Sequence, residues 1–299
     1  MYIVVTGSTG MVGEAVCRRL MDEGHRVGRL VRPESNFQAP QGTWSKWDPK
    51  TGLIDPKFID GADAVIHLAG ENIAGWWTAR KMKRIVDSRV EGTALLAKTL
   101  AGLMNKPGVF LCASATGFYG DRPDETLDES SKSGAGFLAE TCRRWEAAAQ
   151  PAKDAGIRTA HMRLGMVLDS AGGAIKAILP IFSLGLGGKI ASGDQYWSWI
   201  TLDDVTGAIS YLLSRDDAGG VYNFTAPEPV TNERFTRAMG KALKRPTIFP
   251  VPATVITLIA DGMADELLLA SQRVVPAHLE ESGYRFEHPH IEGALKAVV

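Results

Sequence analysis

Short apolar runs alternate with helical patterns over the first two thirds of the chain. The runs are rich in β-branched residues at consecutive positions, which is typical of parallel strands buried on both faces. Between them, apolar residues recur every three to four positions, as in amphipathic helices. This alternation predicts an α/β fold built on a doubly wound, Rossmann-type parallel sheet. The predicted strands cover residues 3–5, 26–31, 46–48, 62–70, 108–116, 156–167 and 221–224, and the predicted helices cover 14–22, 78–100, 138–154 and 205–213.

The alternation loosens after residue 171, where glycine-rich loops lead to an aromatic segment at 195–200. That segment either lines a pocket or packs in a core. Beyond residue 225 the pattern predicts small helices separated by prolines. We therefore expect a Rossmann domain made of residues 1–165 and about 195–225, and a smaller mixed C-terminal substrate lobe made of about 166–194 and 226–299.

A glycine-rich turn follows the first predicted strand directly. Gly7 permits a tight turn, Gly10 leaves room for a pyrophosphate, and Gly13 lets the next helix pack against the strand. Backbone N–H groups and the helix N-terminus would then face the phosphates. The spacing predicts dinucleotide binding, although a purely structural turn can have the same glycines. The residues assigned to the cofactor here are Thr6, Gly7, Thr9, Gly10, Met11, Val12 and Gly13.

Two arginines near the end of the second strand bear on which dinucleotide is bound. An acidic side chain there would bind a free ribose 2′-hydroxyl and disfavour a 2′-phosphate. This chain has Arg29 and Arg32 instead, and a planar guanidinium suits a phosphate. We therefore expect NADP rather than NAD, with Arg32 on the phosphate; the alternative is a solvated arginine pair. Asp48, which precedes Pro49, either approaches the adenine or is a turn residue.

The charge balance limits the partners of the chain. Lys and Arg number 33 against 34 Asp and Glu, so nothing favours nucleic acid or an anionic membrane, and a small-molecule substrate is expected. The cationic stretch 80–84 is expected to be a solvated helix face. Three scattered cysteines suit reduced thiols in a cytoplasmic protein. We expect no leader before the first strand, and the apolar run 251–260 is too short to span a bilayer.

Further candidate residues lie at the ends of the strands predicted at 62–70 and 108–116. In an open parallel sheet, ligands collect beyond the carboxyl ends of the strands. His67, inside the first of these strands, is expected to be a buried structural histidine rather than a catalytic one. Ser114 lies at the end of the other strand, where it can meet a ligand. Small residues let a ligand approach the backbone, and the cofactor-binding residues assigned on that ground are Leu68, Ala69 and Gly70.

Five short motifs follow one another along the chain. They are the segments 6–13, 67–70, 90–93, 114–120 and 199–205. With this set the chain resembles the extended short-chain dehydrogenase/reductases, which include sugar-nucleotide epimerases and dehydratases. The segments 70–73, 137–140 and 268–286 resemble an atypical branch of that family, the epimerase family proteins, which has its own C-terminal module. The resemblance implies a Rossmann fold, a nicotinamide cofactor and a protein that is a monomer or a homodimer.

The resemblance also suggests roles for single residues. Ser114 matches the catalytic serine of the family, which hydrogen-bonds a substrate carbonyl or hydroxyl. Tyr119 matches a tyrosine that lines the substrate pocket, with a packing role as the alternative. Glu71 is a candidate acid or base, or else a structural cap. Arg89 stands where many relatives have Asn, and we group it with the cofactor-binding residues.

The Tyr-x-x-x-Lys pair of the family is absent. The lysine normally lowers the pKa of the tyrosine, which then exchanges a proton while hydride moves. No tyrosine of this chain has Lys four residues later; Phe137 and Thr141 or Cys142 stand near the two places. Two functions stay open. One is an NADP(H)-dependent oxidoreductase or epimerase acting on a small hydroxy or carbonyl compound, and the other is a catalytically inactive NADP(H)-sensing protein.

Overall fold

The computed structural model describes residues 1–254, 263 and 265–299. At its centre lies a sheet of seven parallel strands in the order β3-β2-β1-β4-β5-β7-β11, which confirms the predicted doubly wound α/β fold. The strand order reverses between β1 and β4, and ligands bind beside such a reversal. The strands are β1 (Tyr2–Thr6), β2 (Arg26–Val31), β3 (Trp44–Lys46), β4 (Ala64–His67), β5 (Val109–Ala115), β7 (Arg158–Leu164) and β11 (Gly220–Phe224).

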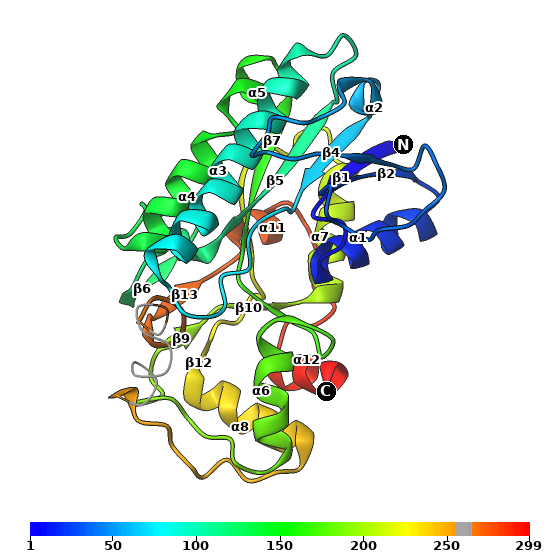
Figure 1. The fold of residues 1–299 in the computed structure, drawn as a ribbon. Helices are drawn as coiled ribbons and strands as arrows, with labels where there is room; N and C mark the ends of the chain where they lie inside the picture. Colours follow the sequence, from blue (N-terminus) through cyan, green and yellow to red (C-terminus); the bar gives the residue numbers. More distant parts are fainter. Residues whose placement is uncertain (255–262, 264) are drawn as a thin grey trace.

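Helices cover both faces of this sheet (Figure 1). On one face α1 and α7 pack over a core that includes Ile3 and Ile66, and on the other face α3, α4 and α5 pack over Val4 and Phe110. Successive side chains of a strand point to opposite faces, so the same strands supply both cores. The helices are α1 (Met11–Asp22), α2 (Pro56–Ile59), α3 (Ala79–Gly102), α4 (Phe137–Ala147), α5 (Gln150–Asp154) and α7 (Leu202–Leu213).

A third apolar core lies beyond the carboxyl ends of the strands, where Figure 1 shows α6, α8 and α12 gathered together. Leu168, Phe235 and Leu295 are fully or almost fully buried in it. Three two-stranded sheets, β8–β10, β9–β12 and β6–β13, lie outside the main sheet. In Figure 1, β9, β10 and β12 lie between the main sheet and this core, and β6 and β13 lie to one side, below α4. The domain boundaries given above stay a prediction. The elements are β6 (Arg122–Leu127), β8 (Met166–Leu168), α6 (Gly173–Ser183), β9 (Tyr196–Trp197), β10 (Trp199–Thr201), β12 (Val230–Thr231), α8 (Asn232–Leu243), β13 (Gln272–Val274), α11 (Ala277–Glu281) and α12 (Ile291–Val298), with the short turns η1 (Thr116–Tyr119) and η2 (Asp265–Leu269).

Some elements differ from the prediction. The helix predicted at 138–154 is divided into α4 and α5, because Pro151 lacks an N–H and cannot continue the first helix. The strand predicted at 156–167 is divided at Gly165 into β7 and β8, which belong to different sheets. A Cβ at Gly165 would lie 2.6 Å from the carbonyl oxygen of Ser198, so the chain passes too close there for any side chain.

The pattern also misses α6 and β6. Helix α6 has a proline inside it and glycines at its start, which weaken its helical signature. Most of β6 is exposed and charged, and it is held by pairing with the distant β13. Part of the apolar run 251–260 lies outside the described residues. In the part of the chain that the structure describes, no helix has the length and apolar character needed to cross a bilayer.

Candidate functional site

The turn between β1 and α1 has the geometry of a phosphate-binding loop. Gly7 has a φ of 68°, and a Cβ there would lie 2.6 Å from the carbonyl carbon of Leu68. A Cβ on Gly13 would lie 2.1 Å from the carbonyl oxygen of Gly7. The Gly10 N–H closes the turn by donating to the same oxygen at 3.0 Å. Side chains are therefore excluded at positions 7 and 13, and the turn lies against the end of β4.

The N-terminus of α1 can receive an anion. Gly10, which precedes the helix, provides no side-chain cap. The first N–H groups of a helix lack partners within the helix and favour negative charge. In addition, the buried hydroxyl of Ser8 has no hydrogen-bond partner among the described residues. Free backbone donors and an unpartnered hydroxyl at one turn fit a pyrophosphate group.

The two arginines near the end of β2 differ in their contacts. Arg29 donates to the carbonyl oxygen of Ser8 at 3.4 Å and lies over the ring of Phe37, so its guanidinium is held at the glycine turn. Arg32 follows β2 directly and pairs with Glu34 at 3.5 Å across largely exposed side chains. Such an exposed pair contributes little stability. Arg29 is thus held at this corner by protein contacts, whereas Arg32 is exposed to solvent there.

His67 and Asp48, for which the sequence left a functional and a structural role open, have the contacts of structural residues. His67 is fully buried, its Nδ1 lies 2.6 Å from the Thr6 hydroxyl, and burial lowers its pKa to about 3. It is therefore neutral at physiological pH, as expected for a structural histidine. Asp48 accepts hydrogen bonds from Lys50 and Thr51 in the turn that follows β3. These contacts are those of a turn residue.

Glu71 follows the Ala-Gly turn after β4 and is held by two cations. Its Oε1 lies 2.9 Å from Lys81 Nζ and 3.4 Å from Arg84 Nε. The hydrogen bond from Lys81 holds the pKa of Glu71 below its usual range. A general acid needs the opposite shift. The carboxylate ties the loop after β4 to the start of α3, so its placement favours the structural alternative.

Arg89, on α3, lies beside the same turn. Its Nη1 donates to the carbonyl oxygens of Glu71 at 3.0 Å and Ile85 at 3.2 Å. The guanidinium carbon lies 5.0 Å from the centre of the Trp145 ring and 3.3 Å from the place of a Cβ on Gly70. Burial lowers the pKa of Arg89 from its ordinary value. The side chain thus reaches the backbone segment that was assigned to the cofactor.

Ser114, at the end of β5, is part of a buried ionic network. It donates to Glu146 Oε1 at 2.7 Å, and Arg163 binds both oxygens of that carboxylate, at 2.8 and 2.9 Å. Burial alone would raise the pKa of Glu146, but hydrogen bonds and charge from Arg163 outweigh it and hold the pKa below its usual range. An ionised carboxylate therefore fixes the orientation of the serine hydroxyl.

Tyr119 lies on the far side of the same network. Its side chain is fully buried; its hydroxyl accepts from Arg163 at 2.9 Å and donates to Asn223 Oδ1 at 2.7 Å. Burial raises the pKa of Tyr119, which keeps the phenol protonated. Because all of its hydrogen-bonding capacity faces protein, its placement favours packing over substrate contact.

The positions of the missing Tyr-Lys pair lie in the first turns of α4. Phe137 packs against Trp77 with ring centres 5.1 Å apart, and Thr141 donates to the carbonyl oxygen of Phe137 at 2.7 Å. Glu266, from the C-terminal segment, accepts hydrogen bonds from the backbone N–H groups of Phe137 and Leu138, both at 2.7 Å. A cavity of about 180 Å³ lies beside this helix end, lined in part by Leu138 and Glu266. The C-terminal segment thus closes one side of the region.

Sequence reasoning does not identify Glu146, Arg163, Asn223 and Glu266 as members of the site. One signal was present, because an arginine inside the otherwise apolar strand β7 needs a partner when it is buried. The partner could not be inferred, since Glu146 is 17 residues away on a helix and Asn223 is on another strand. Glu266 has no comparable signal, because its contact depends on how the last fifty residues fold back.

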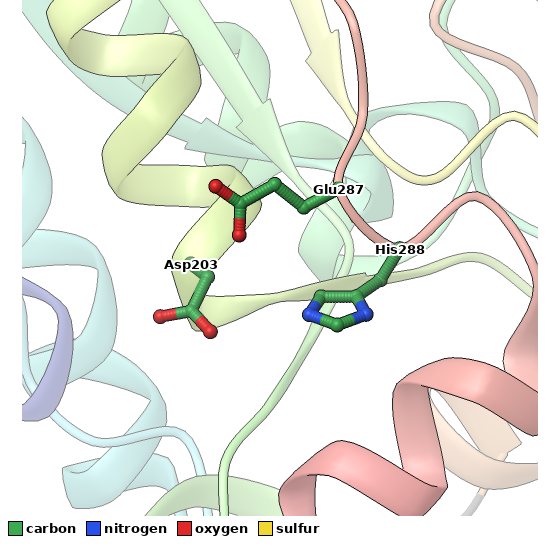
Figure 2. A group of neighbouring side chains, drawn as sticks. All are labelled: Asp203, Glu287 and His288. Atoms are coloured by element: carbon green, nitrogen blue, oxygen red, sulfur yellow. The ribbon is translucent and has the colours of Figure 1, made fainter.

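One acidic cluster lies outside this region. Asp203, Glu287 and His288 each offer an atom that could bind a metal, and these atoms lie within 4.8 Å of one another (Figure 2). The two carboxylates are exposed. The neighbouring Asp204 is buried and accepts the backbone N–H groups of Glu287 and His288, which explains why the tail lies here. We assign no metal to this cluster.

Comparisons with known proteins agree with this architecture. The NAD dependent epimerase/dehydratase family matches residues 3–150, and a domain of unknown function, DUF1731, matches 251–298. The epimerase family protein Mb2239 of Mycobacterium bovis is 38% identical over 98% of this chain and 96% of its own. The crystal structure of human epimerase family protein SDR39U1 with NADPH is 32% identical, with a TM-score of 0.90 over 100% of this chain and 99% of that one. A UDP-glucose 4-epimerase of Thermus thermophilus, 18% identical with a TM-score of 0.76 over 100% and 97%, shares the fold.

Proposed function

The chain belongs to the epimerase family proteins, and from this premise we propose that it binds NADP(H) and acts on a small hydroxy or carbonyl compound. The observation that carries the proposal is the turn between β1 and α1, where any side chain at Gly13 would collide with the backbone of Gly7. The human relative, which was crystallised with NADPH, supports the choice of cofactor.

The proposal gives each group of cofactor-binding residues a part. The turn and the α1 N-terminus bind the pyrophosphate. Arg32, helped by Arg29, binds the ribose 2′-phosphate. The backbone from Leu68 to Gly70, with Arg89 beside it, lies along the nicotinamide half. When bound, the cofactor would supply or accept the hydride.

Ser114 is the residue that we propose to contact the reacting oxygen of the substrate. Its hydroxyl lies at the carboxyl end of β5, and Glu146 fixes its direction through the 2.7 Å hydrogen bond. We assign Glu71 and Tyr119 to positioning roles, because the first is locked by Lys81 and the second is fully buried.

A second function, an NADP(H) sensor without turnover, is supported by a different observation. Phe137 and Thr141 occupy the first turns of α4, where active relatives carry tyrosine and lysine, and neither can exchange a proton at neutral pH. A protein of this kind would keep the cofactor site intact. Both proposed functions include NADP(H) binding, and they differ only in whether the protein catalyses a reaction.

Calorimetry tests the cofactor. We expect NADPH to bind more tightly than NADH by roughly tenfold or more, since a bidentate arginine–phosphate contact is strong. Arg32→Ala should remove most of this difference, and Arg18→Ala, which removes an exposed cation of α1, should leave it unchanged. Equal affinities for NADPH and NADH in the wild type would refute the phosphate assignment.

A substrate screen separates enzyme from sensor. Aldehydes, ketones and nucleotide sugars would be tested for NADPH oxidation or epimer formation. Turnover that disappears in Ser114→Ala supports the enzyme, whereas tight NADPH binding with no turnover supports the sensor. A cytoplasmic location and a monomeric or homodimeric state are also part of the proposal, and light scattering coupled to gel filtration measures the second.

A further inference from the structure

Arg89 differs from the other partly or fully buried cations near the site. Arg163 is neutralised by both oxygens of Glu146, and Lys81 by Glu71. Among the described residues, no carboxylate lies within ion-pair distance of Arg89, whose Nη1 donates only to backbone carbonyl oxygens. Arg89 is half-buried, and a partly desolvated charge without a counter-ion is a place where an anion from outside the chain would be stabilised.

The surroundings of Arg89 carry an excess of positive charge. Glu71 is the acidic group nearest to it in the loop, and its carboxylate is already shared between Lys81 and Arg84. Three cations therefore stand against one carboxylate at this corner. The Trp145 ring lies 5.0 Å from the guanidinium of Arg89, and two backbone carbonyl oxygens hold that guanidinium in place through Nη1. A planar, bidentate anion matches such a fixed guanidinium best.

Arg89 also lies close to Ser114. The Trp145 ring lies 5.0 Å from the Arg89 guanidinium, and the next residue of α4, Glu146, accepts the Ser114 hydroxyl at 2.7 Å. The phosphates of a bound dinucleotide belong to the N-terminus of α1, and its nicotinamide riboside half carries no further anionic group. An anion at Arg89 would therefore come from the second ligand.

We propose that Arg89 binds the carboxylate of the substrate, which is a hydroxy carboxylic acid whose hydroxyl donates to Ser114 Oγ, since the serine proton is already donated to Glu146. This inference rests on the proposed NADP(H) function and names the substrate class of that site. The guanidinium replaces the neutral amide that many relatives carry at this place. Recognition of a carboxylate there distinguishes this chain from enzymes that bind uncharged sugar rings.

The test uses the full chain saturated with NADPH. Two-hydroxy carboxylates of three to six carbons are titrated by calorimetry, and the matching amides serve as uncharged controls. We expect carboxylates to bind at least ~10-fold more tightly than amides, because a charged hydrogen-bonded pair is lost in the amide. Arg89→Gln should abolish that preference, and Arg89→Lys should restore part of it. Lys83→Gln, which removes a cation of the same helix that is 74% exposed and pairs with Asp87, should keep it.

Each outcome decides the inference. Equal binding of carboxylates and amides by the wild-type protein overturns it, whether or not Arg89→Gln folds. It is also overturned if Arg89→Gln keeps the carboxylate preference, or if that variant loses only NADPH affinity, which would place Arg89 on a cofactor phosphate. Failure of the wild-type chain to bind NADPH at all is measured first and refutes the proposed function instead.

Discussion

The glycine turn after β1 and the ionic network around Ser114, the two halves of the proposed site, are built by different means. The turn is built from backbone: Gly7 and Gly13 are required because a Cβ would meet main-chain atoms. The network is built from side chains of three separate elements, joined through Glu146 and Arg163. A cofactor cradle can therefore persist while the residues that exchange protons change. In this chain the first half follows the family pattern and the second departs from it.

Arg163→Met tests the side-chain half and should have the largest effect. It leaves the Glu146 carboxylate buried without its cation, which costs about 3–5 kcal/mol of unfolding free energy at pH 7. Urea denaturation measures this loss. Arg18→Met, which removes an exposed cation of α1 that pairs with Glu14, should change stability by less than about 0.5 kcal/mol. A similar loss of unfolding free energy in both variants would show that the buried Arg163–Glu146 pair contributes no more stability than an exposed ion pair.

The same variant has a distinctive pH dependence. In the wild type the pKa of Glu146 lies below its ordinary value, so the stability from the pair is present above pH ~4.3 and is lost as the pH falls through the lower folded pKa. Without Arg163, burial raises the pKa of Glu146, and protonation relieves the unpaired charge. The stability difference between the two proteins should therefore shrink on acidification from pH 7 to pH ~4. A constant difference would contradict this account.

Gly13→Ala tests the backbone half. The new Cβ would lie 2.1 Å from the carbonyl oxygen of Gly7, and only movement of the turn can relieve the collision. Overpacking of this kind costs about 1–3 kcal/mol, and if the strain falls on the turn the NADPH affinity should drop by up to ~100-fold. Gly293→Ala in α12, where a Cβ meets nothing within 4 Å, should leave affinity unchanged. If Gly13→Ala binds NADPH as tightly as the wild type, the backbone of the turn is not required for cofactor binding, and the contrast between the two regions is wrong.

Tyr119→Phe sharpens the comparison by asking whether this tyrosine belongs to the network or to the chemistry. Removal of its hydroxyl leaves groups of Arg163 and Asn223 unpartnered, so stability should fall by about 1–2 kcal/mol. NADPH affinity and any turnover found in the screen should stay within about threefold of wild type, a change of less than 1 kcal/mol. Tyr196→Phe, whose ring lies against Arg273, is the matched control and should be neutral. Lost turnover with unchanged stability would instead make Tyr119 catalytic.

Glu266→Gln should have the smallest effect. The carboxylate accepts two N–H groups at the start of α4, and the amide keeps one acceptor but loses the charge that favours a helix N-terminus. We expect about 1 kcal/mol of lost stability and faster hydrogen exchange at the first turn of α4. Asp265→Asn, the exposed neighbour, should not alter exchange there. If both variants behave alike, the C-terminal segment is held by apolar contacts alone.

The fold could be predicted well because its signals are local. Strand and helix periodicity follow from which residues alternate, and the glycine spacing follows from the geometry of one turn. The predicted elements are wrong where a segment distant in the sequence determines the local structure. Strand β6 forms by pairing with β13, and β7 ends at Gly165 because the backbone of Ser198 lies close to it. The resemblance to a family supplied Ser114, but the reason that its hydroxyl is held in one direction lies in Glu146.

By itself the sequence determined the α/β sheet, the phosphate turn and the absence of the Tyr-Lys pair, because each depends on residues that are neighbours along the chain. Only the tertiary structure decided which charges are paired. The sequence alone does not distinguish Arg163 from Arg89. In the fold, Arg163 pairs with Glu146, whereas among the described residues the hydrogen bonds of Arg89 go to backbone carbonyl oxygens. Ion pairing between residues far apart in the sequence is determined by how the helices pack on the sheet. The free energy of a buried charge depends on whether an opposite charge lies beside it. That Arg89 has no carboxylate partner among the described residues is therefore visible only in the folded chain.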